Sequence, residues 1–275
     1  MQVAAIQMVS TPSVERNLAQ ARDLVAQAAQ AGAELVALPE YFCLMGHSDA
    51  DKLSHAERLL DGPIQRMLSD TAREHGLWLV GGTLPLIPED GPYERVRNCC
   101  LAFAPDGELA ARYDKIHLFR FHDGERRYDE AATLEPGTTP AAFDATDRAG
   151  ERWRVGLSVC YDLRFPELYR ALMQPRSCDL LLVPSAFTYP TGQAHWELLL
   201  RARAVENQAY VLAPAQGGRH ENGRRTWGHS MLVDPWGEVL AQQAAEGEGL
   251  VAGTLARARL SQVRAQLPAL EHRVL

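Results

Sequence analysis

Short apolar segments that end abruptly at a polar residue recur along this chain and alternate with segments of helical periodicity. The apolar segments are predicted to be strands at 3–8, 34–38, 77–80, 153–159, 179–183, 210–215 and 250–255. Helices are predicted at 14–28, 63–76, 167–173 and 194–208, and hairpins at 99–113 and 230–241. Loops are expected at 85–97, 117–150 and 216–226. This order predicts an α/β fold in one domain, with a mixed sheet and helices on its outer faces.

Three chemically useful residues follow directly on predicted strands. These residues are Glu40, Lys115 and Cys160. If their strands are neighbours, the three side chains converge at one edge of the sheet, where ligands bind in sheets of this kind. The backbone N–H groups of the turn after Cys160 can also receive negative charge. We therefore expect Cys160 to be a nucleophile that has an acid and a lysine beside it.

The chemistry of such a nucleophile accounts for the other two residue types. A thiol has a reference pKa of about 8.5, so that only a few per cent is thiolate at neutral pH and a base is needed. The Glu40 carboxylate can be that base and can later activate water. A tetrahedral intermediate at a carbonyl carries an oxyanion, which Lys115 and the backbone N–H of Tyr161 could stabilise.

The overall charge and the terminal sequence exclude several classes of partner. The formal net charge is −7 and the pI is near 5.7, which argues against nucleic acid or an anionic membrane as the main partner. No apolar run approaches the roughly 20 residues of a spanning helix. The first residues also lack the basic region and long apolar core of a signal peptide. Five cysteines, two of them adjacent, do not form a disulfide framework, so a reducing cytoplasm is expected.

The histidines and the remaining cysteines favour structural roles. His195, His220 and His229 do not show the spacing of a metal site, and we expect them to form hydrogen bonds or line a pocket. No metal is therefore predicted. The other cysteines are expected to pack in the core, and they are Cys43, Cys99, Cys100 and Cys178.

Three stretches resemble the signatures of a known enzyme family. Leu38-Pro39-Glu40, the segment 113–119 (YDKIHLF) and the segment 160–167 (CYDLRFPE) resemble, in that order, the three signatures of the nitrilase, or carbon–nitrogen hydrolase, superfamily. The resemblance runs over nearly the whole chain. It implies an αββα sandwich, a single carbon–nitrogen hydrolase domain over residues 1–275 with a C-terminal tail from about 256 to 275, and pairing into homodimers.

The resemblance also implies roles for individual residues. Glu40 corresponds to the general base, Lys115 to the oxyanion stabiliser and Cys160 to the nucleophile of a reaction that uses no cofactor. A second family glutamate, in the loop after the lysine, corresponds to Glu130.

Later segments indicate which branch of the superfamily the chain resembles. Residues 194–208 resemble the amidase branch that acts on short omega-amides of dicarboxylic acids. Residues 215–218 with His220, 228–231 and 234–237 resemble most the deaminated glutathione amidases, and the omega-amidases are near neighbours. The implied activity is hydrolysis of a small carboxylate-bearing amide, such as deaminated glutathione, through a cysteine thioester. Alternatives are an omega-amidase acting on 2-oxoglutaramate or 2-oxosuccinamate, a nitrilase, and a non-catalytic scaffold. A nucleotide-binding module is disfavoured because the glycine fingerprint is missing.

Two further residues could decide which substrate is accepted. Arg164 lies one turn beyond Cys160 and could form a bidentate clamp on a substrate carboxylate. Its alternative role is a structural ion pair with Asp162 or Glu167. Thr188 follows another predicted strand and could hydrogen-bond to the same end of the substrate.

Overall fold

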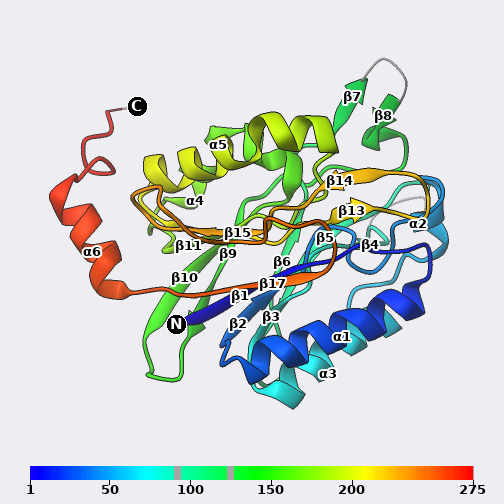
Figure 1. Cartoon of the computed structure of the whole chain (residues 1–275), viewed down its shortest axis with the longest axis horizontal. Helices are drawn as coiled ribbons and strands as arrows, with labels where there is room; N and C mark the ends of the chain where they lie inside the picture. The colour runs from blue at the N-terminus through cyan, green and yellow to red at the C-terminus, as the bar shows by residue number, and fades with distance from the viewer. Residues whose placement is uncertain (90–93, 123–126, 275) are drawn as a thin grey trace.

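Two β-sheets face each other and helices cover their outer faces (Figure 1). The computed structural model describes residues 1–89, 94–122 and 127–274. Helices α1 (Val14–Gln30) and α3 (Pro63–His75) cover one sheet, and α4 (Pro166–Leu172) and α5 (Tyr189–Asn207) cover the other. The αββα arrangement that the sequence implied is confirmed.

The first sheet has seven strands in the order β17-β1-β2-β3-β5-β4, with β6 also paired to β5. Its strands are β1 (Gln2–Gln7), β2 (Leu35–Ala37), β3 (Trp78–Val80), β4 (Leu84–Leu86), β5 (Arg97–Phe103), β6 (Leu109–Asp114) and β17 (Gly249–Thr254). Strands β1, β2 and β3 run parallel, whereas β5, β6 and β17 join by antiparallel pairing.

The second sheet has six strands in the order β16-β15-β12-β11-β10-β9. Its strands are β9 (Ala141–Thr146), β10 (Arg152–Leu157), β11 (Leu180–Leu182), β12 (Tyr210–Ala213), β15 (Met231–Val233) and β16 (Val239–Gln242). Two small hairpins pair β7 (Arg120–His122) with β8 (Arg127–Asp129), and β13 (Gly217–Arg219) with β14 (Arg225–Trp227). The shorter helices are α2 (Asp51–Ser54), α6 (Arg257–Gln266), and the 3₁₀ helices η1 (Glu130–Ala132) and η2 (Cys160–Arg164).

The core is divided between the two faces of the first sheet. Along β1, Val3 and Ala5 belong to the apolar cluster between the sheets, whereas Ala4 and Ile6 belong to the cluster under α1 and α3. Because both faces are covered, successive residues are all buried although they point in opposite directions. This is why the strand has a continuous apolar sequence. Within the described ranges, no helix combines the length and apolar character needed to cross a membrane.

Three expected loops contain strands. The segment 85–97 was expected to be a loop, but β4 lies at its start with Leu84 and Leu86 buried against β5. The segment 117–150 contains β7, β8 and β9, and 216–226 contains β13 and part of β14. Residues 90–93 and 123–126 of these segments lie outside the described residues. Strands β7, β8, β9, β13 and β14 were missed because none is a continuous buried apolar run; β9, for example, alternates buried residues with exposed ones.

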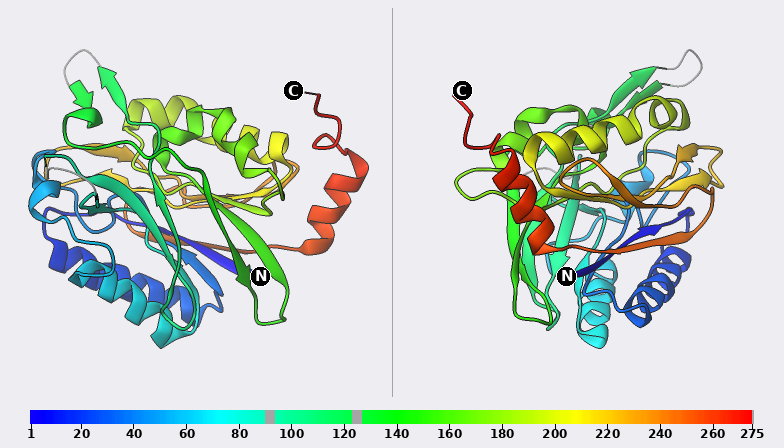
Figure 2. Two further views of the ribbon diagram at one scale, coloured as in Figure 1. Left: turned by 180° about the vertical axis from the view of Figure 1, so that it is seen from behind. Right: turned by 60° about the vertical axis from the view of Figure 1, so that its left-hand side comes forward.

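The position of the candidate site also differs from the expectation. Glu40 follows β2 and Lys115 follows β6 in the first sheet, but Cys160 follows β10 in the second. The three residues therefore meet across two facing sheets and not along the edge of one. The β7–β8 hairpin lies at one end of the sandwich, and α6 lies at the other (Figure 2).

A glycine beside β3 controls the approach of the segment that carries Glu40. Gly82 has φ +50°, and a Cβ at this position would overlap the carbonyl oxygen of Pro39. We expect Gly82→Ala to lower the free energy of unfolding by about 3 kcal/mol, because the left-handed backbone and the overlap each cost about 1–2 kcal/mol. Urea unfolding measures this loss.

The matched control is Gly32→Ala. Gly32 also has a positive φ, +91°, but a Cβ there would have no heavy atom within 4 Å. It should therefore lose only the backbone contribution, about 1 kcal/mol. Equal losses in the two variants would show that Pro39 does not restrict the Gly82 site.

Candidate active site

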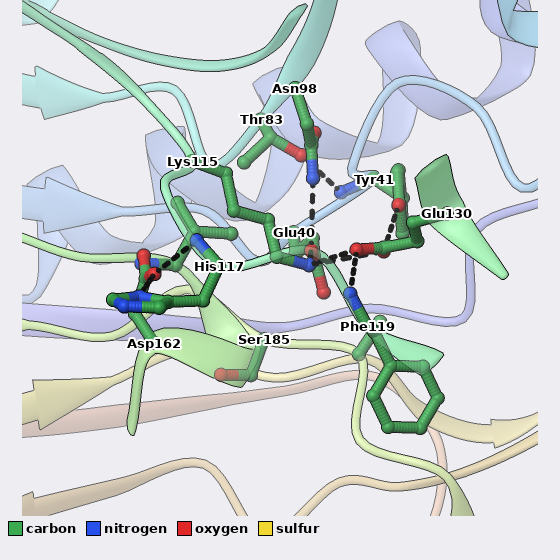
Figure 3. A network of polar contacts seen from close by, with 12 residues as sticks. Glu40, Tyr41, Thr83, Asn98, Lys115, His117, Phe119, Glu130, Asp162 and Ser185 are labelled. Atoms are coloured by element: carbon green, nitrogen blue, oxygen red, sulfur yellow. Dashed lines mark hydrogen bonds and ion pairs between the residues drawn. The ribbon is translucent and has the colours of Figure 1, made fainter. Parts of the chain in front are cut away.

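The Lys115 ammonium lies between two carboxylates (Figure 3). Its Nζ is 2.9 Å from Oε1 of Glu40, and it is 2.8 Å and 3.0 Å from the two oxygens of Glu130. All three residues are buried, with Glu40 and Lys115 each only 1% exposed. Burial alone would lower the pKa of the lysine. The charges of Glu130 and Glu40 outweigh burial and raise that pKa above its ordinary value, so that Lys115 remains an ammonium.

Glu130 uses both of its oxygens to hold this ammonium in place. The Tyr41 hydroxyl donates to Oε1 at 2.7 Å, and the Phe119 backbone N–H donates to Oε2 at 2.7 Å. Burial acts to raise the pKa of Glu130, but the Lys115 charge and these hydrogen bonds bring it below the ordinary value. Glu130 is therefore an ionised carboxylate suited to positioning Lys115 and not to accepting protons.

Glu40 connects the lysine to the thiol. Its Oε1 accepts hydrogen bonds from Lys115 and from the side-chain amide of Asn98, the latter at 3.0 Å. The Cys160 side chain lies beside this carboxylate, because both line one cavity and the Glu40 charge acts on the thiol. A base beside the thiol is the geometry that a proton transfer requires.

The Cys160 thiol is held in a strained turn. Cys160 has φ +50° at the start of η2, and its backbone N–H donates to the Pro184 carbonyl at 2.9 Å. Burial raises the pKa of the thiol well above its ordinary value, and the Glu40 charge raises it further. The Lys115 ammonium and the Ala186 N–H act to lower the pKa of the thiol, but less strongly than burial raises it. The resting group is thus a protonated thiol that needs a base.

A buried aspartate ties the lysine segment to the cysteine segment (Figure 3). Asp162 is fully buried and accepts hydrogen bonds from the Tyr113 hydroxyl at 2.7 Å and the Val159 N–H at 2.8 Å. The backbone N–H and the ring Nδ1 of His117 lie 3.0 Å and 2.7 Å from its other oxygen. Because these partners flank Lys115 and Cys160 in the sequence, Asp162 fixes the two segments relative to each other.

A narrow space adjoins the sulfur and is called the thiol cavity. It has about 280 Å³ of empty volume. The residues that line it are Glu40, Phe119, Glu130, Cys160, Tyr161, Arg164, Ala186, Phe187, Thr188, Thr191 and Arg224. The sequence-predicted residues Tyr161, Arg164 and Thr188 are therefore brought to the same space as Glu40, Glu130 and Cys160.

Arg164 faces aromatic rings and a histidine. Its guanidinium carbon is 5.8 Å and 5.4 Å from the ring centroids of Tyr161 and Phe187, and its Nη1 is 3.3 Å from Nδ1 of His195. Among the described contacts it forms no ion pair with Asp162, whose oxygens are used by other donors. Thr188 makes a hydroxyl–hydroxyl hydrogen bond of 2.8 Å with Thr191.

The other predicted histidines and cysteines have structural surroundings. His220 is buried between the Ser10 carbonyl and the Thr226 hydroxyl, and burial lowers its pKa to about 4. All five cysteines are free and buried. In the described part of the chain, no group of three or more His, Cys, Asp or Glu residues could hold a metal ion.

Sequence reasoning missed several residues of the site. Tyr41 and Asn98 contact the carboxylates, Thr191 and Arg224 line the thiol cavity, and Asp162 was considered only as a partner of Arg164. Tyr41 and Asp162 lie inside or beside the quoted motifs, so the motifs offered a signal for these two. Asn98, Thr191 and Arg224 have no local pattern that distinguishes them from other polar residues.

Comparison with known proteins places this geometry in a family. The profile of the carbon–nitrogen hydrolase family matches residues 2–265. A deaminated glutathione amidase of Synechocystis sp. is 42% identical over 273 residues, which cover 98% of this chain and 97% of that protein. Omega-amidase NIT2 of Homo sapiens is 38% identical over 267 residues, which cover 97% of this chain and 92% of that protein. The fold is also similar to the crystal structure of Saccharomyces cerevisiae Nit3, a member of branch 10 of the nitrilase superfamily. The TM-score is 0.86 at 30% identity, and the match covers 100% of this chain and 97% of that chain.

The charges around the sulfur predict opposite effects of two substitutions. Glu40→Gln should lower the pH at which Cys160 is alkylated by iodoacetamide, because it removes the charge that opposes the thiolate. Lys115→Met should raise that pH, because it removes the cation that favours the thiolate. Mass spectrometry over a pH series gives the midpoint for each variant. Midpoints that move in the same direction, or do not move, would contradict the assignment of these charges.

Proposed function

This chain belongs to the carbon–nitrogen hydrolase family, and on that premise we propose that it hydrolyses deaminated glutathione, a small carboxylate-bearing amide. The observation that carries the proposal is a buried thiol that shares a cavity with a carboxylate, which is itself bound to a buried ammonium. The substrate assignment is supported by the deaminated glutathione amidase that is 42% identical over almost the full length of both chains.

The first half of the reaction forms a thioester. Glu40 takes the proton from Cys160 as the sulfur bonds to the amide carbonyl carbon, and the C=O electron pair moves to the oxygen. Lys115 and the Tyr161 N–H stabilise this oxyanion. The electron pair then returns, the C–N bond breaks, and Glu40 gives its proton to the departing nitrogen.

The second half releases the acid. Water occupies the space left by the amine, and Glu40 takes a proton from it as the water oxygen bonds to the thioester carbon. The C–S bond breaks when the second tetrahedral intermediate collapses, and the sulfur regains a proton from Glu40. Glu130 keeps Lys115 in position throughout, a role supported by its saturated hydrogen bonding.

The acyl half of the substrate is proposed to bind with its carboxylate on Arg164. The guanidinium lies in the thiol cavity on the aromatic rings of Tyr161 and Phe187, and the Thr188 and Thr191 hydroxyls lie in the same cavity. A planar guanidinium binds a carboxylate through two parallel hydrogen bonds. This interaction fixes the distance from the carboxylate to the carbonyl that Cys160 attacks.

An omega-amidase acting on 2-oxoglutaramate is the second candidate. It is supported by the 38% identity to omega-amidase NIT2 of Homo sapiens. 2-Oxoglutaramate has the same acyl group as deaminated glutathione but releases ammonia. 2-Oxosuccinamate, which is one carbon shorter, would place its amide differently from Cys160 when its carboxylate is bound to Arg164. Kinetics on these amides side by side distinguish the candidates.

The chain is further proposed to be a homodimer in the cytoplasm and to consist of one catalytic domain with a short C-terminal tail. The dimer is supported by exposed apolar side chains, Leu198 and Val205 on α5 and Trp236 in the turn that packs on this helix. Five free cysteines support a reducing compartment. The domain is supported by the family match over residues 2–265.

Light scattering tests the proposed dimer. It should give twice the chain mass of 30.4 kDa, and the mass of one chain would contradict the dimer.

Replacement of the nucleophile tests the reaction. Cys160→Ala should lower the rate of 2-oxoglutarate release from deaminated glutathione at least about 10³-fold, because no thioester can form. Circular dichroism and the unfolding midpoint should be close to those of the wild type.

Cys178→Ala is the matched control, since this thiol is also buried but contacts the Leu172 carbonyl away from the thiol cavity. It should keep its activity within about threefold of the wild type. Undiminished turnover by Cys160→Ala would refute the proposed mechanism.

A further inference from the structure

A second and larger cavity adjoins the thiol cavity and is called the loop cavity. It has about 1100 Å³ of empty volume. Its walls come from the segment 41–52, from Tyr128 and Leu134, and from Asn222 and Arg224. The Asn222 side chain donates to the Gly46 carbonyl at 2.6 Å, so the two loops that form these walls are tied together.

The loop cavity lies directly beside the two catalytic carboxylates proposed here. Tyr41 lines it and donates its hydroxyl to Glu130, which lines the thiol cavity. Asn98 also lines it and donates to Glu40. Arg224 lines both cavities. A substrate that reaches Cys160 can therefore extend past Arg224 from one cavity into the other.

Size divides the substrate between the two cavities. Sites that hold a drug-sized ligand have about 300–1,000 Å³. Of the empty volume of each cavity, the space that a ligand can enter is about 320 Å³ in the loop cavity, which is within that range and large enough for a dipeptide. In the thiol cavity it is about 10 Å³, room for about one water-sized group, so the larger part of a substrate belongs in the loop cavity. When the acyl carboxylate binds Arg164, the scissile nitrogen is on the far side of the carbonyl from Arg164. The group attached to that nitrogen must then leave the thiol cavity.

Three cationic side chains line the loop cavity, Lys52, Arg127 and Arg224. Arg127 is exposed and pairs with Asp129 at 3.5 Å, so Lys52 and Arg224 are the two suited to an anionic group. The Lys52 side chain is only 12% exposed, and its ammonium lies 5.3 Å from the centroid of the Tyr41 ring. Its ion pair at 3.3 Å is with Asp49, an exposed residue at the rim. The guanidinium of Arg224 lies 5.6 Å from the centroid of the Tyr128 ring.

Arg224 also has an unused hydrogen-bond donor. Its Nη2 donates to the Ala186 carbonyl at 3.0 Å, but its Nε is buried and has no hydrogen-bond partner in the described structure. A buried polar atom without a partner is rare and costly in folded proteins. A ligand carboxylate would supply the missing acceptor.

On the basis of the amide hydrolysis proposed for Cys160, we propose that the loop cavity binds the leaving amine, that this amine carries a carboxylate, and that Arg224 and Lys52 pair with it. Cysteinylglycine, which deaminated glutathione releases, has this chemistry and size. Ammonia, which 2-oxoglutaramate releases, makes no use of the cavity. The loop cavity is therefore the feature that favours a peptide-like amide over a primary amide.

Three substrates with a common product test this assignment. They are deaminated glutathione, its C-terminal glycinamide, and 2-oxoglutaramate, and each yields 2-oxoglutarate. The wild type should have a higher kcat/KM for the free acid than for the glycinamide. Arg224→Gln and Lys52→Met should each lower this preference about tenfold, the loss expected for one charge-assisted hydrogen bond. Arg164→Lys, at the acyl end, should lower activity on all three substrates to a similar extent.

Arg225→Gln is the matched control for Arg224. Its guanidinium stacks 3.6 Å from the Tyr189 centroid and pairs with Glu246, outside both cavities. It should keep the wild-type preference, and unfolding midpoints would identify any variant that fails to fold. If Arg224→Gln does not fold, the result is decided by Lys52→Met, through its ratio of kcat/KM for the free acid to kcat/KM for the glycinamide.

The outcomes separate the two proposals. A wild type that cleaves none of the three amides would refute the proposed function. A wild type that cleaves 2-oxoglutaramate alone would refute both deaminated glutathione as the substrate and the leaving-group site, and would leave the second candidate, the omega-amidase. A wild type that cleaves deaminated glutathione but treats the free acid and the glycinamide equally would refute the leaving-group site alone. Folded Arg224→Gln and Lys52→Met variants that keep the wild-type preference would also refute it.

Discussion

The buried ammonium of Lys115 is the interaction on which the rest of the site depends. An ion pair taken out of water is stable only if the remaining charges and hydrogen-bond positions are satisfied. Here two carboxylates surround one ammonium, and Tyr41, Asn98 and the Phe119 N–H donate further hydrogen bonds to the same three oxygens that bind Lys115. The group therefore has an excess of negative charge. Together with burial, that excess keeps the Cys160 proton in place until a substrate carbonyl can accept the sulfur.

The fold holds this group by rigid attachments between the two sheets. Glu40 and Lys115 come from the first sheet and Cys160 from the second, so a small slide of one sheet would separate base from thiol. Asp162 opposes such a slide because one buried carboxylate binds partners beside both Lys115 and Cys160. The reactive groups lie at the ends of strands, and the residues that hydrogen-bond to them are also buried. This arrangement gives the positional precision that a proton transfer needs.

In the reaction proposed here, the reacting groups and the residues that select the substrate lie in different parts of the molecule. The reacting groups are buried at strand ends, whereas the walls of the loop cavity come from segments 41–52 and 222–224, which connect elements of the fold. Loops of this kind can change without disturbing the sheets that carry them. The relatives of this chain include two differently named amidases, a deaminated glutathione amidase and an omega-amidase.

The sequence by itself determined the α/β alternation, most of the strands and helices, and the family to which Glu40, Lys115 and Cys160 point. It could do so because burial on both faces makes a strand continuously apolar, and because the motifs are local. Only the tertiary structure decided that the three residues meet across two sheets, that Arg164 lies on aromatic rings, and that Asn98 and Arg224 join the site. These contacts join residues that are far apart in the sequence; Lys115 and Glu40, for example, are 75 positions apart. Local periodicity indicates whether a residue is buried, but it does not indicate which distant residue it contacts. Those contacts are determined by how the strands pair and how the two sheets pack against each other.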